Sequence, residues 1–185
     1  MTVRVSKPEF NLREKISELD FGQVPLQKMP AGSVVQVVFG STTTEAMRAH
    51  STNNGTETFV FDTNLSATIT PRFTTSKILV QINQSYMFIN TTSTQMQANV
   101  LICDGDNNVL DGRSLNYDML RVKNITAFAG THSAQLLHSP NTISTFTYKT
   151  RGNFYHCEGG TGYLAFQYAN KTNCVSTISL MEIAQ

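Results

Sequence analysis

The sequence predicts an all-β fold, an antiparallel β-sandwich of the jelly-roll kind, preceded by a short N-terminal amphipathic helix. The first observation is a two-residue alternation, clearest over residues 76–88, where Ile78, Val80 and Ile82 share one face. The second is that similar stretches recur almost to the C-terminus, separated by Thr, Ser, Asn and Gly. The third is that no helical segments lie between these stretches, which argues against a parallel sheet with crossover helices.

The composition fits one domain with a hydrophobic core and few charges. The chain has 185 residues, of which 40% are hydrophobic and 15% are charged, and its formal net charge is +1. A chain of this length buries roughly 70% of its unfolded surface on folding. Nucleic-acid binding needs clustered Lys and Arg, so this charge balance argues against a nucleic-acid partner.

The sequence also argues against membrane insertion, secretion and a disulfide framework. No apolar run approaches the roughly 18 residues that cross a bilayer, and the N-terminus lacks the apolar stretch of a secretory signal. We therefore expect synthesis in the cytoplasm and no membrane insertion. Cys103, Cys157 and Cys174 lack CxxC spacing, which predicts buried thiols instead of disulfides or a zinc site.

One helical segment is predicted, over residues 10–20. Asn11 and Glu14 have the spacing of a capping box, which favours a helix start there. A helix this short is marginal alone in water, so it needs a surface to pack against, either on its own β-domain or on sister subunits or another docking partner. Its narrow apolar stripe, which we treat as the candidate anchoring and oligomerisation site, consists of Leu12, Ile16 and Leu19.

A proline-containing linker follows the predicted helix. Pro25 and Pro30 block helix formation and hold their predecessors extended, and Gly32 supplies a turn. We therefore expect an anchoring helix and linker over residues 1–32 and a β-sandwich display domain over residues 33–185.

Strand candidates follow at short intervals beyond the linker. A two-residue alternation bounded by turn residues predicts strands at 34–39, 57–62, 67–70, 76–88, 95–103, 141–149, 162–169 and 175–183. Residues 41–57 are predicted to form a long loop, and residues 104–108 a hairpin turn leading into Val109 and Leu110. Residues 114–130 fit neither a strand nor a loop clearly.

No arrangement of residues predicts a catalytic chemistry, a metal site or a cofactor. Residues 104–108 resemble the start of a calcium loop, but Leu115 holds the place of the acidic ligand at position twelve, so a plain turn is favoured. The His-Cys-Glu triplet at 156–158 could supply metal ligands, yet adjacent strand residues point to opposite faces. We therefore expect the protein not to be an enzyme.

Aromatic side chains gather late in the chain, and two of them are candidates for glycan contact. Exposed rings beside polar groups stack on sugar faces. Alternation assigns most of these rings to the core. Phe154 and Tyr155 lie beside turn residues, so they are the best candidates for exposure and for a glycan-contact site.

Four segments of the chain carry a family resemblance: residues 1–21, 29–38, 62–88 and 176–184. Together they combine a helical leader with one strand signature, and they resemble small structural proteins of marine tailed phages, cyanobacterial phages in particular. Such proteins are commonly labelled tail-fibre-like or virion structural proteins. The resemblance implies a particle component with a β-sandwich display domain, a homotrimeric state and no catalytic residues.

We therefore expect a structural virion protein of a tailed phage, a fibre- or adhesin-like component attached to the tail or neck through its N-terminal segment. A capsid decoration protein on the head exterior is the alternative, and a free carbohydrate-binding β-sandwich module is a third candidate. The expected partners are further copies in a homotrimer, other virion proteins of the tail, neck or capsid, and a host surface glycan. The expected location is the virion.

Overall fold

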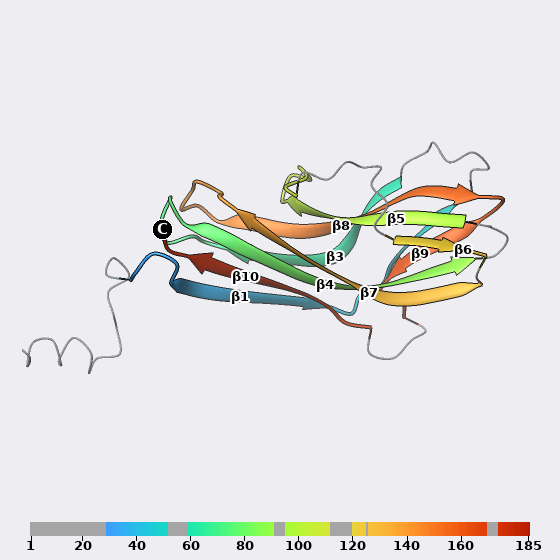
Figure 1. The fold of residues 1–185 in the computed structure, drawn as a ribbon, viewed down its shortest axis with the longest axis horizontal. Helices are drawn as coiled ribbons and strands as arrows, with labels where there is room; N and C mark the ends of the chain where they lie inside the picture. The colour runs from blue at the N-terminus through green and yellow to red at the C-terminus, as the bar shows by residue number, and fades with distance from the viewer. Residues whose placement is uncertain (1–28, 52–58, 91–94, 112–119, 125, 170–173) are drawn as a thin grey trace, which may run out of the picture.

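The computed structural model describes residues 29–51, 59–90, 95–111, 120–124, 126–169 and 174–185. These residues form two antiparallel β-sheets packed face to face (Figure 1). Sheet A contains β1 (Val34–Thr42), β2 (Ala46–His50), β4 (Lys77–Asn90), β7 (Ala127–His138), β9 (Gly162–Phe166) and β10 (Ser176–Ile183). Sheet B contains β3 (Phe59–Ile69), β5 (Gln95–Asp104), β6 (Leu120–Lys123) and β8 (Phe146–Glu158).

The predicted all-β antiparallel sandwich is confirmed for the described residues. The predicted helix over residues 10–20, with its stripe of Leu12, Ile16 and Leu19, lies outside them. Strand β1 begins at Val34, next to the expected domain boundary at residue 33. The division into an anchoring segment and a display domain therefore stays a prediction.

Strand β4 is the centre of sheet A. On one side it pairs with β7 along most of its length. On its other side it pairs with β10 in its first half and with β9 in its second half. Strand β10 also pairs with β1, and β9 also pairs with β2. The position beside β4 is therefore shared by β10 and β9, and the next position is shared by β1 and β2.

Sheet B has the strand order β3-β8-β5-β6. Along the chain, β3 in sheet B precedes β4 in sheet A, and β5 and β6 in sheet B precede β7 in sheet A. Strand β8 then returns to sheet B before β9 and β10 complete sheet A. The path therefore crosses repeatedly between the two layers, and each crossing leaves a loop at one end of the sandwich.

The core fills the space between the two sheets with side chains from alternate strand positions. Ile78, Val80 and Ile82 of β4 are at most 4% exposed, as the alternation predicts. Gly152 of β8 faces Phe166 of β9, and a Cβ at this glycine would overlap the phenylalanine ring. The absence of a side chain at residue 152 therefore lets the two layers approach around this ring.

The sequence-based assignments differ from the structure in four places. The predicted loop over 41–57 contains β2, and the short strands predicted at 57–62 and 67–70 belong to one strand, β3, interrupted by a bulge between Asp62 and Ser66. The unassigned stretch 114–130 contains β6 and the start of β7. Strand β8 runs on to Glu158, well beyond the predicted end at residue 149.

Candidate interaction surface

The two residues predicted to contact glycan are buried. Phe154 is 0% exposed and packs edge-on against Phe88 and His50, and Tyr155 is 9% exposed. The prediction that these rings are exposed is therefore wrong. The reason is that β8 continues past residue 154 instead of turning there, so the alternation of the strand carries Phe154 to the inner face.

The His-Cys-Glu triplet is divided between the two faces of β8, as its spacing predicts. Cys157 is fully buried, while His156 and Glu158 approach each other at 4.0 Å on the outer face. Among the described residues, no three His, Cys, Asp or Glu side chains gather in a way that could hold a metal ion. Within the same residues, no helix has the length and apolar character needed to span a membrane.

The predicted hairpin at residues 104–108 is confirmed, and the Asp104 carboxylate organises it. This carboxylate accepts hydrogen bonds from the backbone N–H groups of Asp106 (2.9 Å) and Asn108 (2.8 Å) and from the Asn108 side chain (2.7 Å). Its partial burial raises the pKa, but these hydrogen bonds lower it by more, so the pKa lies below its ordinary value. The turn returns the chain so that Val109 pairs with Cys103.

Glu182 performs a similar structural task at the end of sheet A. Its side chain is 0% exposed and accepts hydrogen bonds from the N–H groups of Arg72 (2.7 Å) and Phe73 (3.3 Å). Its other oxygen accepts from Gln36 at 2.6 Å. Burial raises the pKa of Glu182, but hydrogen bonds to its carboxylate lower it by more, so the net shift is downward.

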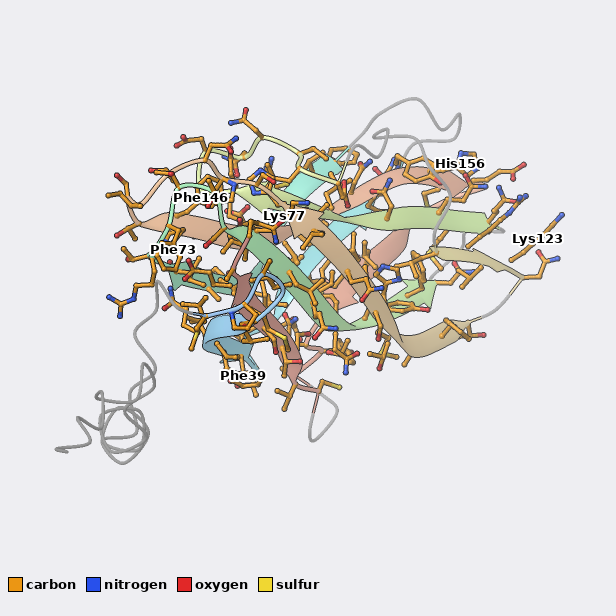
Figure 2. The ribbon with its side chains drawn as sticks, turned by 60° about the vertical axis from the view of Figure 1, so that its left-hand side comes forward. Phe39, Phe73, Lys77, Lys123, Phe146 and His156 are labelled. Atoms are coloured by element: carbon orange, nitrogen blue, oxygen red, sulfur yellow. The ribbon has the colours of Figure 1, made fainter. Side chains whose placement is uncertain are left out.

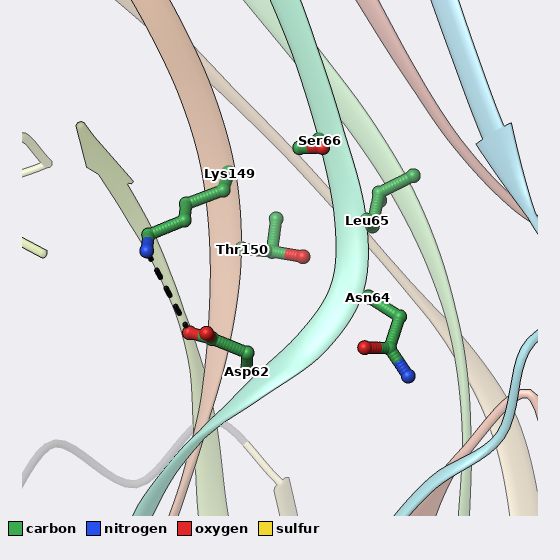
Figure 3. Close-up of a pocket in the computed structure, with 6 residues that line it drawn as sticks. All are labelled: Asp62, Asn64, Leu65, Ser66, Lys149 and Thr150. Atoms are coloured by element: carbon green, nitrogen blue, oxygen red, sulfur yellow. Dashed lines mark ion pairs between the residues drawn. The ribbon is translucent and has the colours of Figure 1, made fainter. Parts of the chain in front are cut away.

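A polar cavity of about 300 Å³ opens beside the bulge of β3. Figure 3 shows its lining residues: Asp62, Asn64, Leu65, Ser66, Lys149 and Thr150. The carboxylate of Asp62 lies 3.9 Å from Nζ of Lys149 and 3.1 Å from Nε of Arg151. The charges at this cavity therefore pair across β3 and β8, which is a stabilising arrangement and not one that activates a nucleophile.

Behind this cavity, five buried polar side chains form a cluster between the two sheets. The hydroxyl of Thr150 donates to Oε1 of Gln84 at 2.8 Å, and Nε2 of Gln84 donates to Oγ of Ser176 at 3.0 Å. All members of the cluster are at most 1% exposed: Thr63, Gln84, Thr150, Gln167 and Ser176.

The cluster lies where three strands are interrupted. With the Gln167 amide oriented so that its oxygen accepts from Ser176, its nitrogen donates to the carbonyls of Thr63 (2.9 Å) and Thr44 (3.0 Å). Thr63 lies in the bulge of β3, Thr44 lies between β1 and β2, and Ser176 begins β10 after the break from β9. The buried amides thus satisfy backbone groups that the interrupted ladders leave unpaired.

A second hollow, of about 430 Å³, lies on the outer side of sheet A near β2 and β9. Tyr163 and Tyr168 line it together with Glu45 and Met47. Glu45 also accepts a hydrogen bond from the backbone N–H of Ala169 at 2.6 Å. The sequence places both tyrosines in the late aromatic group, but it does not reveal that they, and not Phe154 and Tyr155, face a hollow.

Another feature of the surface is the outward side of sheet A over β1, β10, the first half of β4 and β7. One row of paired residues crosses all four strands: Val37, Met181, Leu79 and Leu137. Val37 is 58% exposed and Leu137 is 52% exposed. Phe39 is 64% exposed and projects from β1 away from His156 and Lys123, as Figure 2 shows.

We call this surface the sheet A face. It consists of the outward side chains of four strands: Val34, Val37, Phe39 and Ser41 of β1; Thr177, Ser179, Met181 and Ile183 of β10; Lys77, Leu79, Gln81, Asn83 and Ser85 of β4; and Thr131, Ser133, Gln135 and Leu137 of β7. Lys77 is the one ionisable side chain among these residues. The other positions are apolar, hydroxyl or amide side chains.

The outward side of sheet B has the opposite character. Its paired strands carry many ionisable side chains outward: Asp62, Arg121, Lys123, Lys149, Arg151, His156 and Glu158. A solvated sheet face normally carries such charges, whereas the centre of a protein interface is depleted of them and enriched in apolar and aromatic groups. The sheet A face therefore has the composition of an interaction surface.

No protein-family model matches the chain, and no curated protein matches it. Solved structures with a weak structural similarity include the infectious bursal disease virus Gx strain, with a TM-score of 0.42 and 14% identity, covering 81% of this chain and 38% of that chain. The infectious bursal disease virus VP2 subviral particle gives a TM-score of 0.38 and 15% identity, with coverage of 81% and 38%. The chain thus spans less than two thirds of the length of these chains.

Proposed function

We propose that the protein is a structural component of a virus particle, a jelly-roll module displayed on the tail or neck through its N-terminal segment. The observation that carries this proposal is the strand order. Sheet A has four strand positions, held by β1/β2, β10/β9, β4 and β7, and sheet B has four, held by β3, β8, β5 and β6. Two four-stranded layers connected in this order correspond to a jelly roll, an architecture frequent in viral coats and lectins.

Three further features support a structural role. The sequence resembles small virion proteins of marine tailed phages, and the sheet A face offers a surface for assembly with other virion proteins or with further copies in a homotrimer. The buried carboxylate of Glu182 accepts hydrogen bonds from backbone amides, which is a structural and not a catalytic use. We therefore propose a protein of the virion without enzymatic activity.

Quantitative mass spectrometry of purified particles tests this proposal. We expect the chain to be present in a symmetric copy number, with roughly a dozen copies for a tail or neck component. Hundreds of copies would instead support a capsid decoration protein on the head exterior. Absence of the chain from purified particles would refute a virion role altogether.

Particles that carry a chain without residues 1–30 test the attachment. We expect this deletion to abolish incorporation, because the leader is proposed to fasten the module to the particle. Full incorporation of the shortened chain would contradict attachment through the leader and would favour a surface of the β-domain.

Carbohydrate binding is the second candidate function, favoured by the hollow that Tyr163 and Tyr168 line with Glu45. Rings beside a carboxylate are a frequent arrangement for stacking on sugars and pairing with their hydroxyls. A glycan array probed with the full chain and with Tyr163→Ala tests it, with Leu137→Ala as a control at a distant exposed position. If the full chain binds none of the glycans on the array, this function is contradicted.

A further inference from the structure

We infer that the sheet A face is a self-association surface that packs against a second copy of this chain across a symmetry axis. This inference rests on the proposed function, because it gives the symmetric particle component its contact between subunits. Three observations carry it: the charge of the face, its apolar row and its area.

The charge of the face suits contact with a copy of itself. Around a symmetry axis, a residue near the axis meets the same residue of the partner, so a charged side chain there faces a like charge. A second row of paired residues crosses the four strands beside the apolar row, and all its members are uncharged: Phe39, Ser179, Gln81 and Gln135. On sheet B, the same geometry would set Lys149 and Arg151 against their own copies.

The apolar row gives such a contact its hydrophobic centre. Val37, Met181, Leu79 and Leu137 form a continuous strip across the sheet, and the exposed ring of Phe39 lies beside it. An exposed apolar strip rimmed by polar residues is typical of a protein interaction site, and a buried aromatic anchor such as Phe39 contributes strongly to the energy of an interface. The amide and hydroxyl groups of the neighbouring rows can pair with those of the partner.

The area of the face reaches the size that a stable contact needs. Four strand positions at about 4.8 Å spacing give a width of about 19 Å, and the nine residues from Lys77 to Ser85 at about 3.3 Å each give a length of about 30 Å. The face therefore covers roughly 600 Å² on each copy. Two copies together approach about 1,200 Å², which is the lower end of stable protein–protein interfaces.

Analytical ultracentrifugation of the full chain, at concentrations from roughly 1 to 100 µM, tests the inference. We expect wild type to form a closed oligomer, and Val37→Lys and Leu137→Lys each to weaken association at least tenfold. Both positions are more than half exposed, so these variants keep the fold, which thermal unfolding verifies. The matched control is Thr68→Lys, at an exposed outward position of sheet B, and it should associate like wild type.

A cysteine at the centre of the face provides a second readout. We expect Gln81→Cys to form a disulfide-linked dimer under mild oxidation, whereas Thr68→Cys should give no more than the wild-type background. Wild type that remains monomeric at the highest concentration would overturn the inference, and so would lysine variants that associate as tightly as wild type.

A monomer in which deletion of residues 1–30 makes the thiol of Gln81→Cys more reactive to iodoacetamide would identify the leader of the same chain as the occupant, which also overturns the inference. The particle measurement distinguishes the two proposals. A chain that is monomeric in solution but present in particles refutes self-association alone, whereas an oligomeric chain absent from particles refutes the virion role alone.

Discussion

Replacing Gln84 by Leu tests whether the polar cluster between the sheets stabilises the fold. The amide of Gln84 accepts from Thr150 and donates to Ser176, and its side chain is 0% exposed. Leucine occupies a similar volume but neither donates nor accepts hydrogen bonds. The change therefore removes the polar interactions of residue 84 without opening a large cavity.

The expected loss follows from the groups that are left behind. The Thr150 hydroxyl, the Ser176 hydroxyl and the Gln167 oxygen each lose one buried partner and keep another, and each lost buried hydrogen bond costs about 1–2 kcal/mol. Burying the leucine side chain returns about 2 kcal/mol. We expect a net loss of about 3 kcal/mol in the free energy of unfolding, which lowers Tm by roughly 6–12 °C for a domain of this size.

Urea and thermal unfolding followed by circular dichroism measure this loss. The control is Gln97→Leu, the same substitution at a half-exposed outward position of β5, where we expect a change within about 0.5 kcal/mol. The double variant Gln84→Leu with Thr150→Val should recover part of the loss, because it removes one stranded hydroxyl. A Gln84→Leu protein as stable as wild type would refute the view that the cluster satisfies the interrupted strands.

The remaining predictions concern packing, pH and thiol reactivity. Gly152→Ala should lose about 1–3 kcal/mol, because its Cβ overlaps the ring of Phe166, whereas Gly105→Ala makes only ordinary contact and should change stability by less than about 0.5 kcal/mol in urea unfolding. Because the pKa of Glu182 is lowered on folding, its carboxylate contributes to stability fully above the ordinary glutamate pKa, and this contribution is lost as the pH falls through the folded pKa. Glu182→Gln should therefore flatten the acid side of the stability profile, measured by urea unfolding at a series of pH values. An unchanged profile would contradict this reasoning. Iodoacetamide labelling of the native protein should modify the half-exposed Cys174 first, because Cys103 and Cys157 are fully buried. Burial also raises the pKa of the Cys103 thiol to about 11. Equal labelling of all three cysteines, measured by mass spectrometry, would argue against the described packing.

The alternation of apolar residues was sufficient to predict the strands whose inner positions are filled by large side chains. Strand β4 is the clearest case, since Ile78, Val80 and Ile82 all reach the core. Strand β7 escaped prediction because Gly130 occupies one of its inner positions, where the Tyr86 ring fills the space that a side chain would need. An alternation interrupted in this way is visible only when the partner strand is known.

The candidate surface was hidden for a related reason. Val34 to Phe39 is apolar on both faces of β1, and the sequence alone assigns such a run to a strand without saying which residues face the core. Val38 packs inward, while Val37 and Phe39 point outward. The prediction that Phe154 and Tyr155 are exposed was wrong because it relied on nearby turn residues, whereas β8 continues through them.

The composition of β1 links the sequence to the proposed self-association. A strand that is apolar on both faces is typical of one that is covered on both faces, whereas a strand with one solvated face alternates apolar and polar residues. In the described part of the chain only the inner face of β1 is covered, and its outward residues Val37 and Phe39 are each more than half exposed. The neighbouring outward positions on β10, β4 and β7 continue this surface, so a partner that packs on β1 also contacts the other three strands. A second copy of the same face meets that description, and Lys77 is the one ionisable side chain that it brings to the contact.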